Sequence, residues 1–133
     1  MNKRFKFNTV GIFTSNNKAA VDFYTKAFGF STEWDGTQPN VEMTLDDMRI
    51  IFFPRKDFER MVSRTFVYPE GLNGTMEISF DVPSFADVDK EYASALSYGA
   101  KPVLPPTTEP WGQRTCYIAD PDGNLIEIGS FNV

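Results

Sequence analysis

The feature that most constrains the fold is an internal repeat, in which one order of predicted elements occurs twice along the 133 residues. In each half, an apolar strand precedes a helix that ends at a glycine, and further strands follow. The two helix-ending glycines, Gly29 and Gly99, are about 70 residues apart. Two copies of a β-α-β-β-β unit predict an α+β fold with pseudo-twofold symmetry. We expect each helix to cover one face of a curved mixed sheet, and the other faces to enclose a cavity.

The predicted elements form a single domain over all 133 residues, made of a first unit at 1–54, a linker or flap at 55–74 and a second unit at 75–133. Segment 55–74 begins with charged residues and ends in turn residues. Loops of this length in a compact domain are usually functional or mobile. Strands are predicted at 5–8, 10–13, 30–34, 41–45 and 48–53 in the first unit, and at 76–82, 102–104, 115–119 and 125–129 in the second.

Composition narrows the classes of function. The chain contains no histidine, which excludes histidine-based acid–base and nucleophilic schemes and leaves carboxylates, carbonyls and water as metal ligands. The net charge of −5 argues against nucleic acid and anionic membranes as partners. No apolar run is long enough to span a membrane, and the opening MNKRFKFNTV has no apolar signal core, so we expect a cytoplasmic protein. The one cysteine, Cys116, alternates within a predicted strand and is expected in the core.

Residues 111–128 predict a β-hairpin, because two apolar runs flank the turn sequence DPDGN at 120–124. Glu127 stands out as a carboxylate between Ile126 and Ile128. Successive strand residues point to opposite faces, and the isoleucines should face the helix. We therefore expect Glu127 to face the cavity, the alternative being a surface ion pair on a solvated strand face.

The same alternation predicts that Glu77 faces the cavity while Met76 and Ile78 face the helix. If Glu77 and Glu127 share one cavity, the repulsion between like charges should raise the pKa of one of them or hold a cation between them.

Four stretches together resemble the vicinal oxygen chelate superfamily, which includes glyoxalases, extradiol dioxygenases and bleomycin resistance proteins. They are residues 10–12 (VGI), 20–30 (AVDFYTKAFGF), 110–112 (PWG) and 120–127 (DPDGNLIE). The resemblance covers almost the whole chain except residues 55–74. It implies the fold more specifically than the function, since one fold can carry several chemistries.

For metal-dependent members, the resemblance implies four ligands, two from each unit. On this chain the first-strand positions are Thr9 and Glu77, and the last-strand positions are Phe52, or Phe53 one residue on, and Glu127. The family usually has His or Gln, Glu, His and Glu at its four positions, so only Glu127 matches. We expect no cofactor beyond a weakly held divalent cation.

Two further residues are candidates for ligand binding. Trp111 lies in a proline-rich loop before the hairpin, where an exposed ring is expected to line a pocket or an interface. Arg114 could bind a carboxylate or phosphate, or lie on a solvated face. The predicted ligand-binding residues are thus Thr9, Phe52, Glu77, Trp111, Arg114 and Glu127.

Two functions from different classes follow. A metal-free binding protein of the bleomycin-resistance type would sequester a small, partly aromatic and cationic molecule, because carboxylates and ring faces both favour cations. The alternative is a glyoxalase-like lyase or isomerase that uses Glu77 or Glu127 as a base or as ligand of a weakly held divalent cation. The resemblance also implies a homodimer with the cavity at the junction of units or chains.

Overall fold

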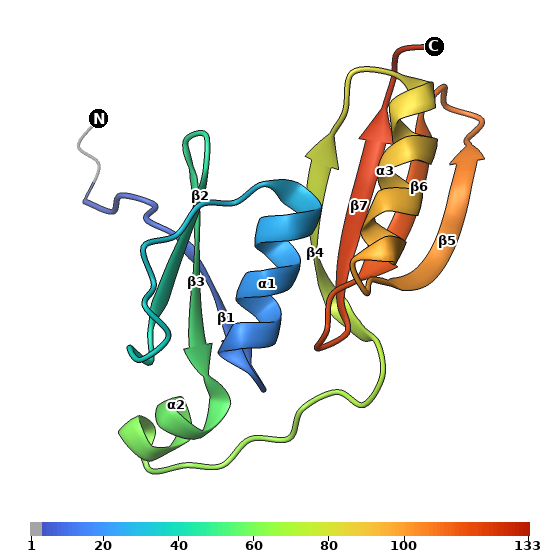
Figure 1. The fold of residues 1–133 in the computed structure, drawn as a ribbon. Coiled ribbons are helices and arrows are strands. Elements are labelled where there is room, and N and C mark those ends of the chain that lie inside the picture. Colours follow the sequence, from blue (N-terminus) through green and yellow to red (C-terminus); the bar gives the residue numbers. More distant parts are fainter. Residues whose placement is uncertain (1–3) are drawn as a thin grey trace.

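The computed structural model of the protein describes residues 4–133 and contains two mixed sheets and three helices (Figure 1). The first sheet contains β1 (Val10–Thr14), β2 (Val41–Leu45) and β3 (Met48–Pro54). The second contains β4 (Asn73–Asp81), β5 (Lys101–Thr108), β6 (Arg114–Ala119) and β7 (Asn124–Ser130). The helices are α1 (Asn17–Phe28), α2 (Arg55–Val62) and α3 (Phe85–Ser97).

Both sheets share one topology. The strand order is β1-β3-β2 in the first sheet and β4-β7-β6-β5 in the second. In each unit the first strand runs parallel to the last, and all other neighbours are antiparallel. This repetition confirms the predicted α+β fold built from two related units. Among the residues described, no helix is both long and apolar enough to cross a membrane.

The strand predicted at 30–34 is reduced to a single bridge between Ser31 and Thr44, so the first sheet has one strand fewer than the second. Beyond the bridge, local side-chain bonds replace backbone pairing. The Thr32 hydroxyl donates to Glu42 O (2.8 Å) and accepts from Trp34 N (3.1 Å). Hydroxyl side chains compete with strand ladders in this way because they offer the backbone another partner.

The segments 5–8 and 55–74 also differ from the prediction. Residues 5–8 are unpaired, with Phe5 and Phe7 84% and 81% exposed. The predicted linker or flap contains α2 at its start and the first residues of β4 at its end. Between them, residues 63–72 form a strap that runs from the first unit to the second (Figure 1).

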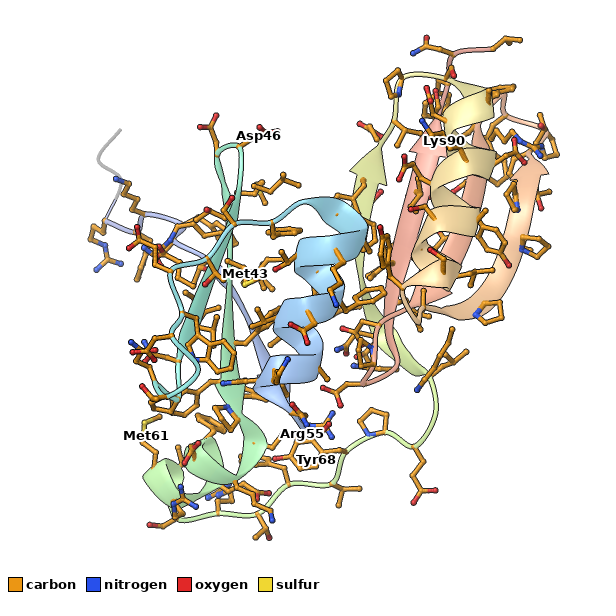
Figure 2. The ribbon with its side chains drawn as sticks, viewed as in Figure 1. Met43, Asp46, Arg55, Met61, Tyr68 and Lys90 are labelled. Carbon is orange, nitrogen blue, oxygen red and sulfur yellow. The ribbon has the colours of Figure 1, made fainter. Side chains whose placement is uncertain are left out.

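Helix α1 joins the two units, because it lies between β3 and β4 (Figure 1) and contacts both sides. On one side Tyr24 packs against Phe52, with ring centroids 5.4 Å apart. On the other, Phe28 stacks on Phe80 at 4.4 Å, and the buried Tyr24 hydroxyl donates to Asp120 Oδ2 at 2.8 Å. One hydrophobic core therefore runs through both units. Figure 2 shows Met43 within the first unit, whereas Asp46 lies at the tip of the β2–β3 turn.

Candidate functional site

The four-stranded sheet has a face that α3 does not cover, called here the open face. On the α3 side, Cys116, Ile118, Ile126 and Ile128 are buried, as predicted for Cys116 and the two isoleucines. Burial raises the pKa of the Cys116 thiol to about 12, which keeps it protonated and unreactive. The residues that alternate with these point the other way. The open face carries Glu77, Ser79, Thr115, Tyr117 and Glu127.

Glu127 is the centre of the open face, as the strand alternation predicted. Its carboxylate accepts hydrogen bonds from three hydroxyls, Ser79 Oγ at 2.6 Å, Thr115 Oγ1 at 2.9 Å and Tyr117 Oη at 3.3 Å. These donors come from β4 and β6, the two neighbours of β7. All three are neutral, so they orient the carboxylate while leaving its negative charge in place.

Tyr117 is held as a neutral donor. Partial burial, together with the nearby carboxylates of Glu127 and Glu77, raises the pKa of Tyr117 from its ordinary 10.0 to about 12. The influence of both carboxylates on one phenol supports the prediction that Glu77 and Glu127 lie on the same face. Met76 does not face the helix as predicted. It is 63% exposed, because the β4 register shifts between Asn73 and Glu77.

The raised pKa predicts how stability depends on alkaline pH. Because folding favours the protonated phenol, the stability linked to Tyr117 is complete below pH 10.0 and is lost as the pH rises through about 12. Tyr117→Phe should therefore flatten part of the fall in unfolding free energy over this range, measured by urea denaturation at several pH values. Tyr98→Phe, at an exposed position, is the control. Equal slopes for wild type and Tyr117→Phe would contradict the arrangement.

The hydroxyl partners of Glu127 were not singled out from the sequence. The turn at 120–124 does carry a signal for one of them, since the hairpin register pairs Tyr117 with Glu127 and Thr115 with Gly129. Ser79 pairs with Glu127 through the parallel contact of β4 and β7, which no local turn determines.

The other predicted site residues lie away from Glu127. Phe52 is completely buried beneath α1 and cannot line a cavity; the residue on the opposite face of β3 is Phe53. The Thr9 hydroxyl donates to Arg49 O at 3.0 Å. Arg114 forms a two-pronged ion pair with Asp89 of α3 (2.9 and 2.7 Å), so its guanidinium points to the helix side.

Trp111 lies beyond the edge of the open face. It is 64% exposed, and its Nε1 donates to Gln113 Oε1 at 3.0 Å. The Gln113 side chain lies directly over Gly129, where an added Cβ would be 2.7 Å from Gln113 Nε2. Trp111 is thus connected to the face through Gln113, and its role in ligand binding stays a prediction.

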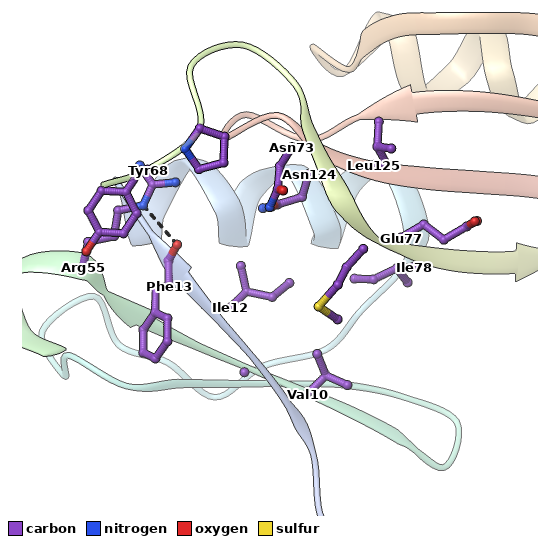
Figure 3. A pocket seen from close by; sticks show the side chains of 13 residues that line it. Val10, Ile12, Phe13, Arg55, Tyr68, Asn73, Glu77, Ile78, Asn124 and Leu125 are labelled. Carbon is purple, nitrogen blue, oxygen red and sulfur yellow. Dashed lines mark hydrogen bonds between the residues drawn. The ribbon is translucent and has the colours of Figure 1, made fainter. Parts of the chain in front are cut away.

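A second feature adjoins the open face. A cleft of about 210 Å³, called here the junction cleft, lies between β1 and β4 and includes Glu77 and Leu125 in its wall (Figure 3). Arg55 and Tyr68 lie at one end of this cleft, and Glu77 lies at the other (Figure 3). Most of the remaining wall is apolar and includes Val10, Ile12, Met76 and Ile78.

Comparison with known proteins identifies the family. The family model described as Glyoxalase/Bleomycin resistance protein/Dioxygenase superfamily matches residues 6–128. The chain belongs to this superfamily. It is 29% identical to an uncharacterised protein of Mycobacterium bovis over 117 residues, which cover 84% of this chain and 74% of the relative.

Solved structures of the superfamily have the same fold. A glyoxalase/bleomycin resistance protein/dioxygenase family enzyme from Burkholderia phytofirmans superposes with a TM-score of 0.80 at 25% identity, covering 92% of this chain and 96% of that one. A lactoylglutathione lyase from Agrobacterium tumefaciens gives 0.71 at 21% identity, covering 94% and 92%. These likenesses confirm the superfamily fold expected from the sequence.

Many members of the superfamily use a metal, but the residues at the corresponding positions here do not fit one. Of the four, Thr9 is bonded to backbone, Phe52 is buried and Glu127 already accepts three hydroxyl bonds. That leaves the Glu77 carboxylate as the one remaining ligand of the four, which is too few for a tight site. Within residues 4–133, no three His, Cys, Asp or Glu side chains cluster as a metal site would require.

Proposed function

We propose that this superfamily member is a metal-free, cytoplasmic small-molecule binding protein of the bleomycin-resistance type, which sequesters a partly aromatic, cationic ligand on the open face. The observation that carries the proposal is the uncompensated charge of Glu127. Its carboxylate is fixed by three neutral hydroxyls, and none of the ion pairs formed within residues 4–133 includes it. A fixed, unpaired carboxylate attracts a cation.

Two neighbours make the open face suited to a ring-bearing ammonium group. The partly buried ring of Tyr117 lies beside Glu127 and can contact an aromatic or cationic group. Glu77 adds a second negative charge that acts on the same phenol. Trp111, beyond Gln113, is proposed to cover the ring of the bound ligand.

The glyoxalase-like alternative needs Glu77 or Glu127 to act as a general base. Glu127 is a poor candidate, because hydroxyl donors already engage both of its oxygens. Glu77 is exposed, so its carboxylate is open to water rather than enclosed as in a closed active site. The hydrogen bonds therefore favour ligand binding over proton abstraction.

Isothermal titration calorimetry with phenylethylammonium and its uncharged counterpart 2-phenylethanol tests the proposal. The wild-type protein should bind the cation at least about tenfold more tightly than the alcohol. The reason is that the positive charge adds about 1.4 kcal/mol or more of binding free energy at a partly buried carboxylate. High salt should weaken the difference. Equal affinity for the two probes would contradict a role for the Glu127 charge.

We also predict a homodimer, because the open face and several large apolar side chains are uncovered. Met76, Trp111 and Phe131 are 63%, 64% and 63% exposed, and large exposed apolar side chains are typical of interaction surfaces. A twofold contact is the commonest way to cover such surface. Light scattering coupled to size-exclusion chromatography should give a mass near 30 kDa, twice the 15.1 kDa chain. A monomer at micromolar concentration would exclude the dimer.

A further inference from the structure

Arg55, the first residue of α2, has an unusual environment for a charged side chain. Its side chain is only 20% exposed, and the guanidinium carbon lies 4.3 Å from the centre of the Tyr68 ring. The Arg55 Nε–H donates to the backbone oxygen of Phe13 at 3.3 Å (Figure 3). These contacts fix the guanidinium at the end of the junction cleft, because one of its faces and one of its donors are engaged.

The two terminal nitrogens of Arg55 keep their donor capacity. Arg55 forms a long ion pair with Asp122, whose Oδ1 is 4.0 Å from Arg55 Nη2 and therefore beyond hydrogen-bond distance. Asp122 is itself engaged by Ser15, which donates to it from both the backbone N–H (3.1 Å) and the hydroxyl. The guanidinium therefore offers parallel N–H groups that no oxygen of the described residues accepts, a geometry that matches a carboxylate.

The rest of the junction cleft limits what can accompany such a carboxylate. Val10, Ile12, Met76 and Ile78 give the cleft an apolar wall (Figure 3), so the ligand needs an apolar body. The volume of about 210 Å³ is below the roughly 300–1,000 Å³ typical of pockets for drug-sized molecules, so that body must be small.

We propose that the junction cleft binds a small amphipathic carboxylate, with its acid group on Arg55 and its apolar body between β1 and β4. This site goes beyond the binding function proposed for the open face, and it takes a ligand of opposite charge. The carboxylate of Glu77 lies at the far end of the cleft from Arg55 (Figure 3), so an anion held by Arg55 is kept apart from it.

The test uses phenylacetate and the uncharged 2-phenylethanol on protein labelled with ¹³C in the methionine methyl groups. Phenylacetate should shift the methyl resonance of Met76, which lines the cleft, and leave in place those of Met43, Met48 and Met61, which do not line it. The alcohol should bind at least about tenfold more weakly, because its single oxygen cannot accept hydrogen bonds from both N–H groups of the guanidinium in parallel. An unshifted Met76 methyl at millimolar phenylacetate, or equal affinity for both probes, would overturn the proposal.

Variants identify the residue responsible. Arg55→Gln should lower the affinity for phenylacetate about tenfold or more, and Arg55→Lys, which keeps the charge but not the planar fork, should lower it several-fold. Arg60→Gln, on the exposed part of α2, should have no effect. If Arg55→Gln does not fold, the lysine variant decides, and wild-type affinity in either folded variant contradicts the site. Glu127→Gln should leave phenylacetate binding unchanged, so that failure here and failure at the open face remain distinguishable.

Discussion

Replacing Asp120 with alanine should lower the free energy of unfolding by about 3–5 kcal/mol. The Asp120 carboxylate is 2% exposed and accepts hydrogen bonds from the Tyr24 hydroxyl (2.8 Å), Asn124 Nδ2 (3.0 Å) and the backbone N–H groups of Asp122 and Asn124 (2.9 Å each). Alanine would leave these donors without an acceptor where water has little access. Tyr24 belongs to the first unit and Asp120 to the second, so the substitution also removes the hydrogen bond that joins them.

Urea denaturation followed by circular dichroism measures this loss. Tyr24→Phe removes one of the four bonds and should cost about 1–2 kcal/mol, since it leaves the turn intact. Asp47→Ala, at an exposed position, should change the unfolding free energy by less than about 0.5 kcal/mol. An Asp120→Ala protein within about 1 kcal/mol of wild type would show that the buried carboxylate is not the main link between the units.

Local chemistry explains which parts of the structure could be predicted. The turn residues at 120–124 predict the hairpin, because Asp120 accepts from the backbone of its own loop and Gly123 adopts a φ of 88°. Strand alternation then places Glu127 on the face opposite Ile126 and Ile128. Pattern and turn chemistry thus suffice for the repeat and for the central carboxylate.

The remaining features depend on contacts between distant residues. Arg114 and Asp89 are 25 positions apart, and Arg114 reaches the helix side only because α3 presents a carboxylate there. Tyr68 contacts Arg55 because the strap at 63–72 returns across α2, and no periodic pattern predicts that path. The site position predicted at Phe52 fails for a related reason. Neighbouring strand residues point to opposite faces, so an uncertainty of one residue in the register decides whether a side chain is buried, as Phe52 is, or faces the other side.

Gly123→Ala is expected to have the second large effect, a loss of about 3 kcal/mol or more in unfolding free energy. A Cβ at this position would lie 1.8 Å from the backbone oxygen of Gly71, and the φ of 88° adds strain for any residue with a side chain. The strap must therefore move away from the hairpin. Because Gly71 lies on the strap, its displacement should loosen this segment, and we also expect faster proteolytic cleavage within residues 63–72.

Gly36→Ala separates the two causes. Gly36 has a similar φ of 95°, but an added Cβ would have no atom within 4 Å. Gly36→Ala should therefore lower the unfolding free energy by about 1–2 kcal/mol, from backbone strain alone. Equal losses for Gly36→Ala and Gly123→Ala in the same denaturation experiment would show that the contact between strap and hairpin is not tight.

The most direct test of a ligand-binding role for Glu127 is to measure the binding and the stability of Glu127→Gln together. Glutamine keeps an oxygen that can accept from the neighbouring hydroxyls but carries no charge. We predict that Glu127→Gln binds phenylethylammonium at least about tenfold more weakly than the wild-type protein. Its unfolding free energy should change by less than about 1 kcal/mol. Glu33→Gln, at an exposed site in the first unit, is the control. Unchanged affinity together with a loss of several kcal/mol would instead make Glu127 a structural carboxylate and contradict the proposed function.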